Sequence, residues 1–214
     1  MGDRLTEHVE TELKFEVGPD FVVPDLSGLA DGQTVRQPEA RLLVASYFDT
    51  SDLRLAEAGI TLRRRTGGSD AGWHLKLPVG AGTRRELRAP LGDASAGVPP
   101  QLASLVATWA RDEPLRVVAT LETRRTVRLL VSASGQALAE VADDLVTGQV
   151  PGPPDAPPGP VTWREIEVEL MSGGPEILAA ARTRLAAAGA RPSSAASKLA
   201  RLLGAPPARS VPGA

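Results

Sequence analysis

The chain has 214 residues, which suits one domain with one core, and its net charge of −2 and pI near 5.8 argue against a nucleic acid or an anionic membrane as its partner. It contains no cysteine, which excludes disulfides, a thiolate nucleophile and a zinc–thiolate site. No apolar run is long enough to span a bilayer and no signal peptide is recognisable, so we expect a cytoplasmic protein.

The first predicted strand, residues 5–17, carries an acidic face. With a side-chain period of two, Glu10, Glu12 and Lys14 lie on one face and mainly apolar side chains lie on the other. The two carboxylates are roughly 7 Å apart and repel by about 2 kcal/mol at an effective dielectric of about 20. A cation between them is therefore expected, although a lone pattern of this kind more often marks an ordinary solvated strand face.

Strands dominate the rest of the pattern. In chain order we predict strands at 41–49, 60–65, 72–78, 83–91, 115–130, 137–146 and 161–170, with helices from Thr50 or Ser51 to Ala58 and at 99–111, 175–188 and 194–203. The proline-rich loop 151–160 cannot donate ladder hydrogen bonds, so it separates the last two strands. We expect one domain over residues 1–203, followed by a tail or linker at 204–214.

Lysine is rare in this chain. Of 24 lysine and arginine residues, only Lys14, Lys76 and Lys198 are lysines. An ammonium group is a compact point charge with rotatable donors, whereas guanidinium is a planar fork. The three lysines are therefore candidates for positions at which only an ammonium group fits, although three survivors of an arginine-rich composition can also arise by chance.

The charged faces of the later strands are segregated by sign. The middle strands carry mainly basic residues, namely Arg63, Arg65, His74, Lys76, Arg84, Arg88 and Arg125, with Glu86 among them. The last two strands carry acidic residues, namely Glu140, Asp143 or Asp144, Glu165, Glu167 and Glu169. A closed antiparallel barrel could turn all these faces inward, where buried ions are costly unless they are paired or coordinated. A polyanion with divalent metal ions would meet that need. The alternative, a solvated sheet with Arg–Glu salt bridges, explains the balance of charge but not its segregation.

These motifs together resemble the CYTH family of triphosphate tunnel metalloenzymes. The resemblance rests on Glu10-x-Glu12-x-Lys14, on Tyr47-Phe48-Asp49-Thr50, on the hairpin from Leu62-Arg63-Arg64-Arg65 to Trp73-His74-Leu75-Lys76, and on Glu165-x-Glu167-x-Glu169, and it covers residues 7–203. It implies a mainly β (α+β) fold, a closed eight-stranded antiparallel β-barrel tunnel with a few helices packed outside. Family members hydrolyse or cyclise triphosphates with a divalent metal ion, so the resemblance implies Mg²⁺ or Mn²⁺ as cofactor.

The resemblance also implies roles for individual residues. Glu10, Glu12, Asp144, Glu167 and Glu169 would hold metal, with Glu140 as a further candidate, and Lys14, Arg63, Arg65, Lys76, Arg84, Arg125 and Lys198 would bind phosphate oxygens. Either a lysine, Lys14 or Lys76, or a carboxylate would assist proton removal from the attacking water. The sequence does not decide whether Asp143 or Asp144 is the metal ligand, nor which of Glu165, Glu167 and Glu169 form the metal-binding pair of the last strand.

The expected function is metal-dependent hydrolysis of inorganic triphosphate to pyrophosphate and phosphate. The alternatives are an enzyme acting on an organic triphosphate, such as a thiamine triphosphatase or an adenylyl cyclase, and a non-catalytic polyphosphate-binding module. An aromatic content of 3% leaves few rings to stack on a base or thiazolium ring, which favours an inorganic substrate. We expect a small-molecule triphosphate as partner, polyphosphate as a further candidate, no nucleic acid or membrane, and a monomer or homodimer.

Overall fold

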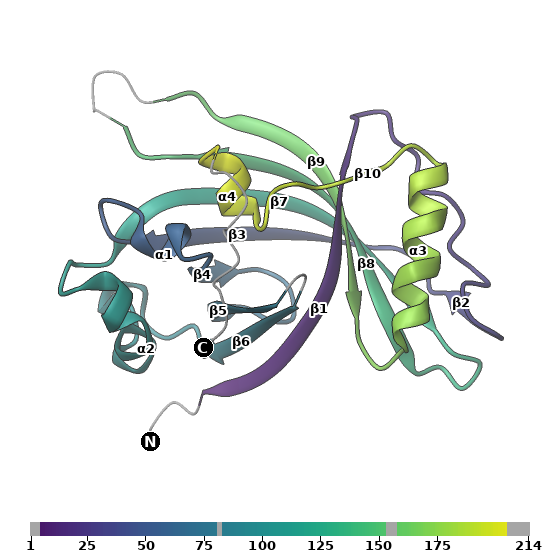
Figure 1. The fold of residues 1–214 in the computed structure, drawn as a ribbon, viewed down its shortest axis with the longest axis horizontal. Coiled ribbons are helices and arrows are strands. Elements are labelled where there is room, and N and C mark those ends of the chain that lie inside the picture. The colour runs from purple at the N-terminus through teal and green to yellow at the C-terminus, as the bar shows by residue number, and fades with distance from the viewer. Residues whose placement is uncertain (1–4, 81–82, 153–157, 205–214) are drawn as a thin grey trace.

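Strands and four short helices make up the fold in the computed structural model, which describes residues 5–80, 83–152 and 158–204 (Figure 1). The strands are β1 (Thr6–Val17), β2 (Thr34–Val35), β3 (Glu39–Asp49), β4 (Thr61–Thr66), β5 (Gly72–Gly80), β6 (Thr83–Ala89), β7 (Arg116–Val131), β8 (Ala137–Gln149), β9 (Val161–Leu170) and β10 (Arg191–Pro192). The helices are α1 (Arg54–Glu57), α2 (Pro100–Ala110), α3 (Pro175–Ala187) and α4 (Lys198–Leu202). Within the described residues, no helix is long and apolar enough to cross a membrane.

Eight strands close into an antiparallel barrel in the order β1-β6-β5-β4-β3-β7-β8-β9. β1 closes the barrel because it has a different neighbour along each half of its length. Its residues 6–11 pair with β6 and its residues 12–17 pair with β9. The short strands β2 and β10 add to β7 and β1. The predicted mainly β fold, a closed eight-stranded antiparallel barrel with helices outside, is confirmed.

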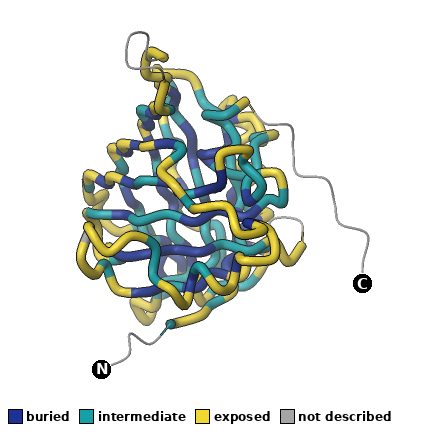
Figure 2. Tube along the Cα trace, turned by 90° about the vertical axis from the view of Figure 1, so that its left-hand side faces the viewer, coloured by how far each residue is buried: buried dark blue, intermediate teal, exposed yellow. Residues whose placement is uncertain are grey.

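The barrel is charged inside and apolar outside. Buried and exposed positions alternate along the strands, as expected from the period of two (Figure 2). On β1, Glu12 and Lys14 line the lumen, whereas Phe15 is buried on the outer side among the residues that pack against α3. Apolar contacts outside the barrel therefore supply much of the core, and the middle of the lumen is left to charged groups.

Helices cover two regions of the apolar outer surface. Leu102 and Val106 are four residues apart on α2, and they pack with Trp73 and other outward residues of β4, β5 and β6. Ile177 and Leu185 of α3 pack against outward residues of β1, β8 and β9. Burial of these side chains stabilises the barrel wall from outside, because apolar area leaves water without filling the lumen.

Helix α4 closes one end of the lumen. Its Leu199 is buried among inward-facing residues of four strands, namely Ala45, Tyr47, Ala119, Leu121, Val146 and Trp163. The helix begins after Ser197, whose hydroxyl accepts a hydrogen bond from the Ala200 N–H over 3.1 Å. The lumen therefore has an apolar floor at the end where β3 finishes and β9 begins.

The short helix after β3 is capped mainly by Asp49. The Asp49 carboxylate accepts the N–H groups of Leu55 and Ala56 over 2.9 Å each, and the Thr50 hydroxyl accepts that of Arg54 over 3.1 Å. The predicted helix from Thr50 or Ser51 to Ala58 is therefore wrong in its bounds: α1 spans Arg54–Glu57 and its N-cap position is Leu53, although the Thr50 hydroxyl does accept an N–H of the first turn. The Asp49-Thr50 pair therefore has a structural role at the end of β3.

The C-terminal helix is shorter than predicted. Residues 194–203 were expected to be helical, but α4 begins at Lys198 because the preceding segment is bonded to the barrel. The Ser193 N–H donates to the Lys14 carbonyl over 2.9 Å, and the Arg84 guanidinium donates to the Ala196 carbonyl. Residues 153–157 of the predicted proline-rich loop and residues 205–214 of the predicted tail lie outside the described residues.

Candidate functional site

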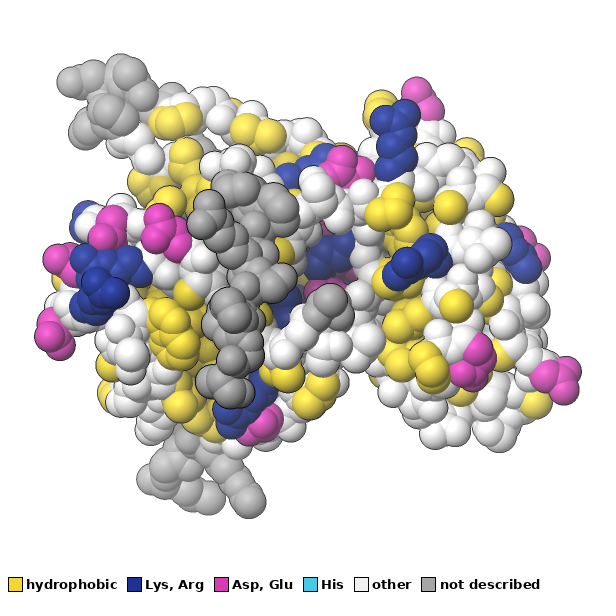
Figure 3. All heavy atoms as spheres, viewed as in Figure 1, with side chains coloured by type: hydrophobic (Ala, Val, Ile, Leu, Met, Phe, Trp, Pro, Cys, Tyr) yellow, Lys and Arg dark blue, Asp and Glu magenta, His cyan; other side chains and the backbone are white. Residues whose placement is uncertain are grey.

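A cavity of about 260 Å³ occupies the lumen. Its lining contains nearly all the predicted site residues: Glu10, Glu12, Lys14, Arg63, Arg65, Lys76, Arg84, Arg125, Glu140, Glu167, Glu169 and Lys198. The remaining one, Asp144, is fully buried next to Arg125 and Lys198. Figure 3 shows basic and acidic side chains inside a hollow near the middle of one face. The structure therefore brings the predicted residues together in one lumen.

Strands β4 and β5 form a basic wall of this cavity. Arg63 donates from Nη1 to the Tyr47 hydroxyl over 3.3 Å, and it forms no ion pair with an acidic side chain of the described residues. Burial lowers the pKa of Arg65 to about 9, and the nearby Arg63 and Arg125 charges act in the same direction. Arg65 and Lys76 are paired with Asp70 and Glu10, so Arg63 is the cation of this wall without an acidic partner among the described residues, and an anion such as a phosphate chain would neutralise it.

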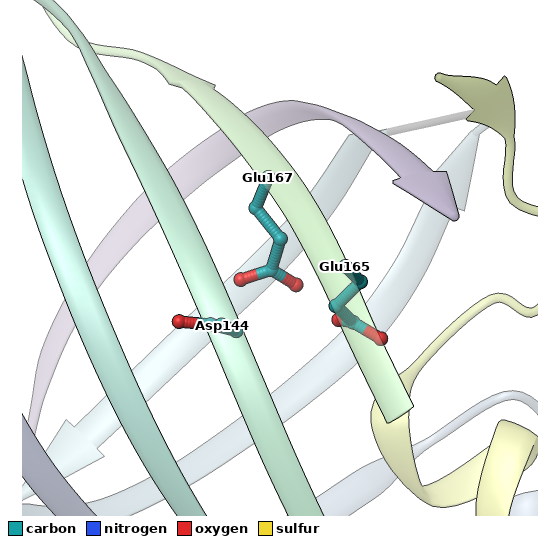
Figure 4. Close-up of side chains that lie close together, drawn as sticks. All are labelled: Asp144, Glu165 and Glu167. Carbon is teal, nitrogen blue, oxygen red and sulfur yellow. The ribbon is translucent and has the colours of Figure 1, made fainter. Parts of the chain in front are cut away.

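Across the lumen, Asp144, Glu165 and Glu167 form a cluster of buried carboxylates (Figure 4). Each offers an oxygen within 4.8 Å of the others. The Lys198 Nζ lies 2.9 Å from Asp144 Oδ2, 2.7 Å from Glu165 Oε1 and 2.8 Å from Glu167 Oε1. Arg125 Nη2 adds contacts of 2.7 Å to Asp144 and to Glu167. These two cations offset the repulsion within the carboxylate cluster.

A second acidic group lies beside this cluster. Its members are Glu10, Glu12, Glu140 and Glu169. Lys76 Nζ lies 2.6 Å from Glu10 and Lys14 Nζ lies 2.8 Å from Glu12, whereas Glu169 forms no ion pair with a cation of the described residues. Burial raises the pKa of Glu169 to about 7, and the Glu10, Glu12 and Glu140 charges contribute. Glu169 is therefore the member of this group whose charge no cation of the described residues offsets.

The acidic wall has donors suited to a divalent metal ion. Mg²⁺ and Mn²⁺ prefer hard carboxylate oxygens, and seven carboxylates from β1, β8 and β9 converge here. They are Glu10, Glu12, Glu140, Asp144, Glu165, Glu167 and Glu169. The residues present thus fit the metal that the motifs imply.

The structure distinguishes Asp143 from Asp144 but does not choose among the three glutamates of β9. Asp144 faces the lumen, whereas Asp143 faces outward and forms an ion pair of 2.9 Å with Arg164. Glu165, Glu167 and Glu169 all face inward. Glu165 therefore belongs to the carboxylate cluster, although we did not include it among the predicted metal ligands.

Lys14 and Lys76, the predicted aids to proton removal, are both held by carboxylates. Lys14 contacts Glu12 and Glu167, while Lys76 contacts Glu10. Glu12 and Glu167 outweigh the effect of burial and raise the pKa of Lys14 above its ordinary value. Lys14 is therefore charged at neutral pH.

Sequence reasoning gave little weight to a buried ion cluster around Glu86. Its Oε1 lies 2.9 Å from His74 Nδ1, and its Oε2 accepts from Arg88 Nε over 2.6 Å and lies 2.9 Å from His8 Nε2. The hydrogen bond from His74 and the charges of nearby cations outweigh burial and hold the pKa of Glu86 well below its ordinary value. The one signal in the sequence for these positions was the alternation of side chains along each strand, which places every second residue on the same face.

A family model described as the CYTH domain matches residues 8–203 of this chain. Two uncharacterized proteins of Mycobacterium tuberculosis, from strains CDC 1551 / Oshkosh and H37Rv, are each 43% identical to it over 212 residues. The alignments cover 94% of this chain and 41% of each relative. The chain thus spans about two fifths of the length of these relatives.

Two solved structures that resemble this chain to different degrees come from Bacillus halodurans and Hippeastrum. A proposed adenylate cyclase from Bacillus halodurans has a TM-score of 0.54 at 18% identity, covering 91% of this chain and 97% of its own. A proposed adenylyl cyclase from Hippeastrum, described as having a dominant triphosphatase activity, has a TM-score of 0.46 at 16% identity, covering 91% and 95%. The likeness to the Bacillus protein shows a shared fold.

Proposed function

Because this chain belongs to the CYTH domain family, we propose that it hydrolyses inorganic triphosphate to pyrophosphate and phosphate with Mg²⁺ or Mn²⁺. The observation that supports this most is the opposition of two walls of unlike charge in one lumen. Arg63 on the basic wall has no acidic ion-pair partner among the described residues, and Glu169 on the acidic wall has no cationic one. A phosphate chain and a divalent cation together supply both missing partners.

The proposed metal ligands are Glu10, Glu12, Asp144, Glu167 and Glu169, with Glu140 and Glu165 beside them. Bound metal would supply charge neutralisation of the phosphate oxygens and activation of the attacking water. Lys198 and Arg125 limit repulsion among Asp144, Glu165 and Glu167, so this part of the acidic wall can fold before it binds a cation.

On the opposite wall, Arg63, Arg65 and Lys76 would bind the non-bridging oxygens of the phosphate chain. Arginine donates in a planar fork that matches two phosphate oxygens, while the lysine ammonium acts as a point charge. Arg84, Arg125 and Lys198 are further candidates for phosphate binding. The apolar floor at α4 keeps bulk water from that end of the lumen, which strengthens these charge interactions.

Proton transfer from water is better suited to a lumen carboxylate than to Lys14. An ammonium group with a raised pKa keeps its proton and donates hydrogen bonds. We therefore assign Lys14 to phosphate binding and place proton acceptance on the acidic wall.

Two other functions share these motifs. A thiamine triphosphatase or an adenylyl cyclase would have to hold an organic group, and Tyr47 is the one aromatic side chain among the described residues that line the cavity. A polyphosphate-binding module without catalysis would need cations but not seven inward carboxylates. Both features favour hydrolysis of a small inorganic substrate.

The test is a product assay with Mg²⁺, Mn²⁺ or EDTA. We expect tripolyphosphate to yield equal amounts of pyrophosphate and phosphate with metal and none with EDTA. Cyclic AMP from ATP would support the cyclase alternative, and tight tripolyphosphate binding without turnover would support the binding module.

Glu12→Gln provides the matched variant, because it keeps the size of a proposed ligand and removes its charge. Turnover should fall by at least about a hundredfold, the upper end of what the loss of an outer-shell partner costs. Circular dichroism checks that the variant is folded. Full activity of a folded variant at saturating Mg²⁺ would remove Glu12 from the ligand set.

A further inference from the structure

The hairpin between β4 and β5 places an acidic side chain at the lumen. Gly68, Ser69 and Asp70 of this hairpin line the cavity. The Asp70 carboxylate accepts from the Arg65 guanidinium, and the two side chains differ in exposure, at 33% for Asp70 and 7% for Arg65. Arg65 is therefore buried in the wall of the lumen, whereas its partner Asp70 lines the same cavity and is partly exposed to solvent.

The hairpin has a backbone shape that fixes where this carboxylate stands. Gly67 and Gly68 have φ values of +78° and +73°, and a Cβ on Gly67 would lie 2.0 Å from the Leu42 carbonyl oxygen. The Asp70 carbonyl oxygen lies 2.9 Å from His74 Nε2, whose ring is buried. Contacts on both sides thus hold the hairpin against β3 and β5.

The hairpin stands at the end of the lumen opposite α4. It joins the end of β4 to the start of β5, beside Leu42 and Leu43 in the first half of β3. The apolar floor instead includes Tyr47 and Ala45 from the second half of β3 and Trp163 at the start of β9. A phosphate chain too long for the cavity can therefore extend toward the hairpin but not through the floor.

We propose, on the basis of the function proposed above, that Asp70 limits the length of the phosphate chain that the lumen accepts. The basic wall attracts the phosphoryl groups as far as Arg65. Beyond Arg65 a further phosphoryl group meets a fixed carboxylate of like charge, and it also competes with that carboxylate for Arg65. Asp70 thereby makes the site selective for triphosphate over longer inorganic polyphosphates.

Binding of tripolyphosphate and tetrapolyphosphate tests this proposal without any turnover. Calorimetric titration in EDTA gives both affinities for the wild type and for three variants, Asp70→Asn, Asp70→Glu and Asp52→Asn. Asp52 is the matched control, because its carboxylate pairs with Arg54 away from the lumen. Asp70→Asn should improve tetrapolyphosphate binding relative to tripolyphosphate by about tenfold, the effect of removing one close like charge.

Asp70→Glu and Asp52→Asn should keep the wild-type ratio. An unchanged ratio in Asp70→Asn, with both affinities lowered together, would overturn the proposal and leave Asp70 as a structural partner of Arg65. Loss of binding to both polyphosphates in the wild type would overturn it as well. The ratio of kcat/KM values with Mg²⁺ should shift in the same direction. If the predicted binding shift occurs but the wild type hydrolyses neither compound, the proposed hydrolysis is wrong, whereas the proposal that Asp70 limits the length of the bound phosphate chain is still supported.

Discussion

Arg63 and Arg64 are neighbours in the sequence and lie on opposite faces of β4. Arg63 lines the cavity, whereas Arg64 pairs across the sheet with Ser46 and Trp73 at outward positions. The two side chains have the same chemistry, so a comparison of the same substitution at each position shows what an arginine contributes when it faces the lumen.

Arg63→Ala should lower kcat/KM for tripolyphosphate by about a hundred- to a thousandfold, the usual effect of removing one preorganised donor. Arg64→Ala should stay close to the wild-type value, because its guanidinium cannot reach the phosphate chain. Initial rates over a substrate series measure both. Equal losses in the two variants would show that Arg63 acts through general charge or folding and not through contact with substrate.

Glu86 makes stability depend on pH in a defined direction. Its pKa is held well below the ordinary value in the folded state, so the folded protein releases this proton more readily than the unfolded chain does. The resulting stabilisation is fully present above the unfolded pKa, 4.5, and is lost as the pH falls through the lower folded pKa.

Glu86→Gln should therefore lower the free energy of unfolding at pH 7 by about 3–5 kcal/mol, since it leaves buried cations without their partner. The difference from the wild type should shrink as the pH falls below about 4.5. Urea unfolding at several pH values measures this, with Glu113→Gln at an exposed position as the control. A difference that stays constant over this pH range would contradict the assignment.

At the scale of elements, strands were easier to predict than the segments that join them. β5 and the second half of β1 alternate between charged and apolar residues, so their inward faces followed from the period alone, whereas in β4 the run Arg63-Arg64-Arg65 interrupts that alternation. Asp143 and Asp144 are adjacent and chemically alike, and only the cross-strand partners Arg125 and Arg164 distinguish them. The two-residue strand β10 has no local pattern that a sequence could reveal.

The position of α4 likewise depends on tertiary contacts. Its start is set by the Ser197 cap and by the bonds that Ser193 and Ala196 form with the barrel. Lys198 was expected in the lumen, but no sequence pattern indicated that its ammonium would contact three carboxylates. The inclusion of Glu165 in that cluster could not be predicted for the same reason.

Lys198→Met should lower stability in EDTA and make it more responsive to metal. Without the ammonium group, Asp144, Glu165 and Glu167 repel one another, and the loss is expected to be about 3–5 kcal/mol. Mg²⁺ or Mn²⁺ should then raise the melting temperature by more than in the wild type, because binding to the folded state offsets this repulsion. Thermal unfolding with and without metal measures the effect.

Arg201→Met is the control for that experiment. Arg201 lies on the same helix, but its guanidinium stacks over Trp163, 5.4 Å from the ring centroid, and does not contact the cluster. Its response to metal should match that of the wild type. An equal response in all three proteins would show that the Lys198 charge is not coupled to a cation site.

At the scale of the whole molecule, the barrel places its apolar packing outside and its ions inside. Most small barrels fill the interior with side chains, and here the charged interior leaves a cavity of about 260 Å³. The buried ions are tolerated because most of them are paired: Lys14, Arg125 and Lys198 contact carboxylates of the acidic wall, and Lys76 pairs with Glu10. The unpaired charges on Arg63 and Glu169 are the basis for the binding site that we propose in the lumen.

The central claim is that this lumen fits three linked phosphoryl groups without an organic group attached. Its most direct test compares kcat/KM for tripolyphosphate, ATP and thiamine triphosphate at one pH and one metal concentration, from initial phosphate release. We predict the highest kcat/KM for tripolyphosphate. The organic groups of the other two substrates have few aromatic rings to stack on, and they would clash with the barrel at the entrance of the lumen. A value for ATP or thiamine triphosphate at least tenfold above that for tripolyphosphate, about 1.4 kcal/mol in transition-state binding, would contradict the claim.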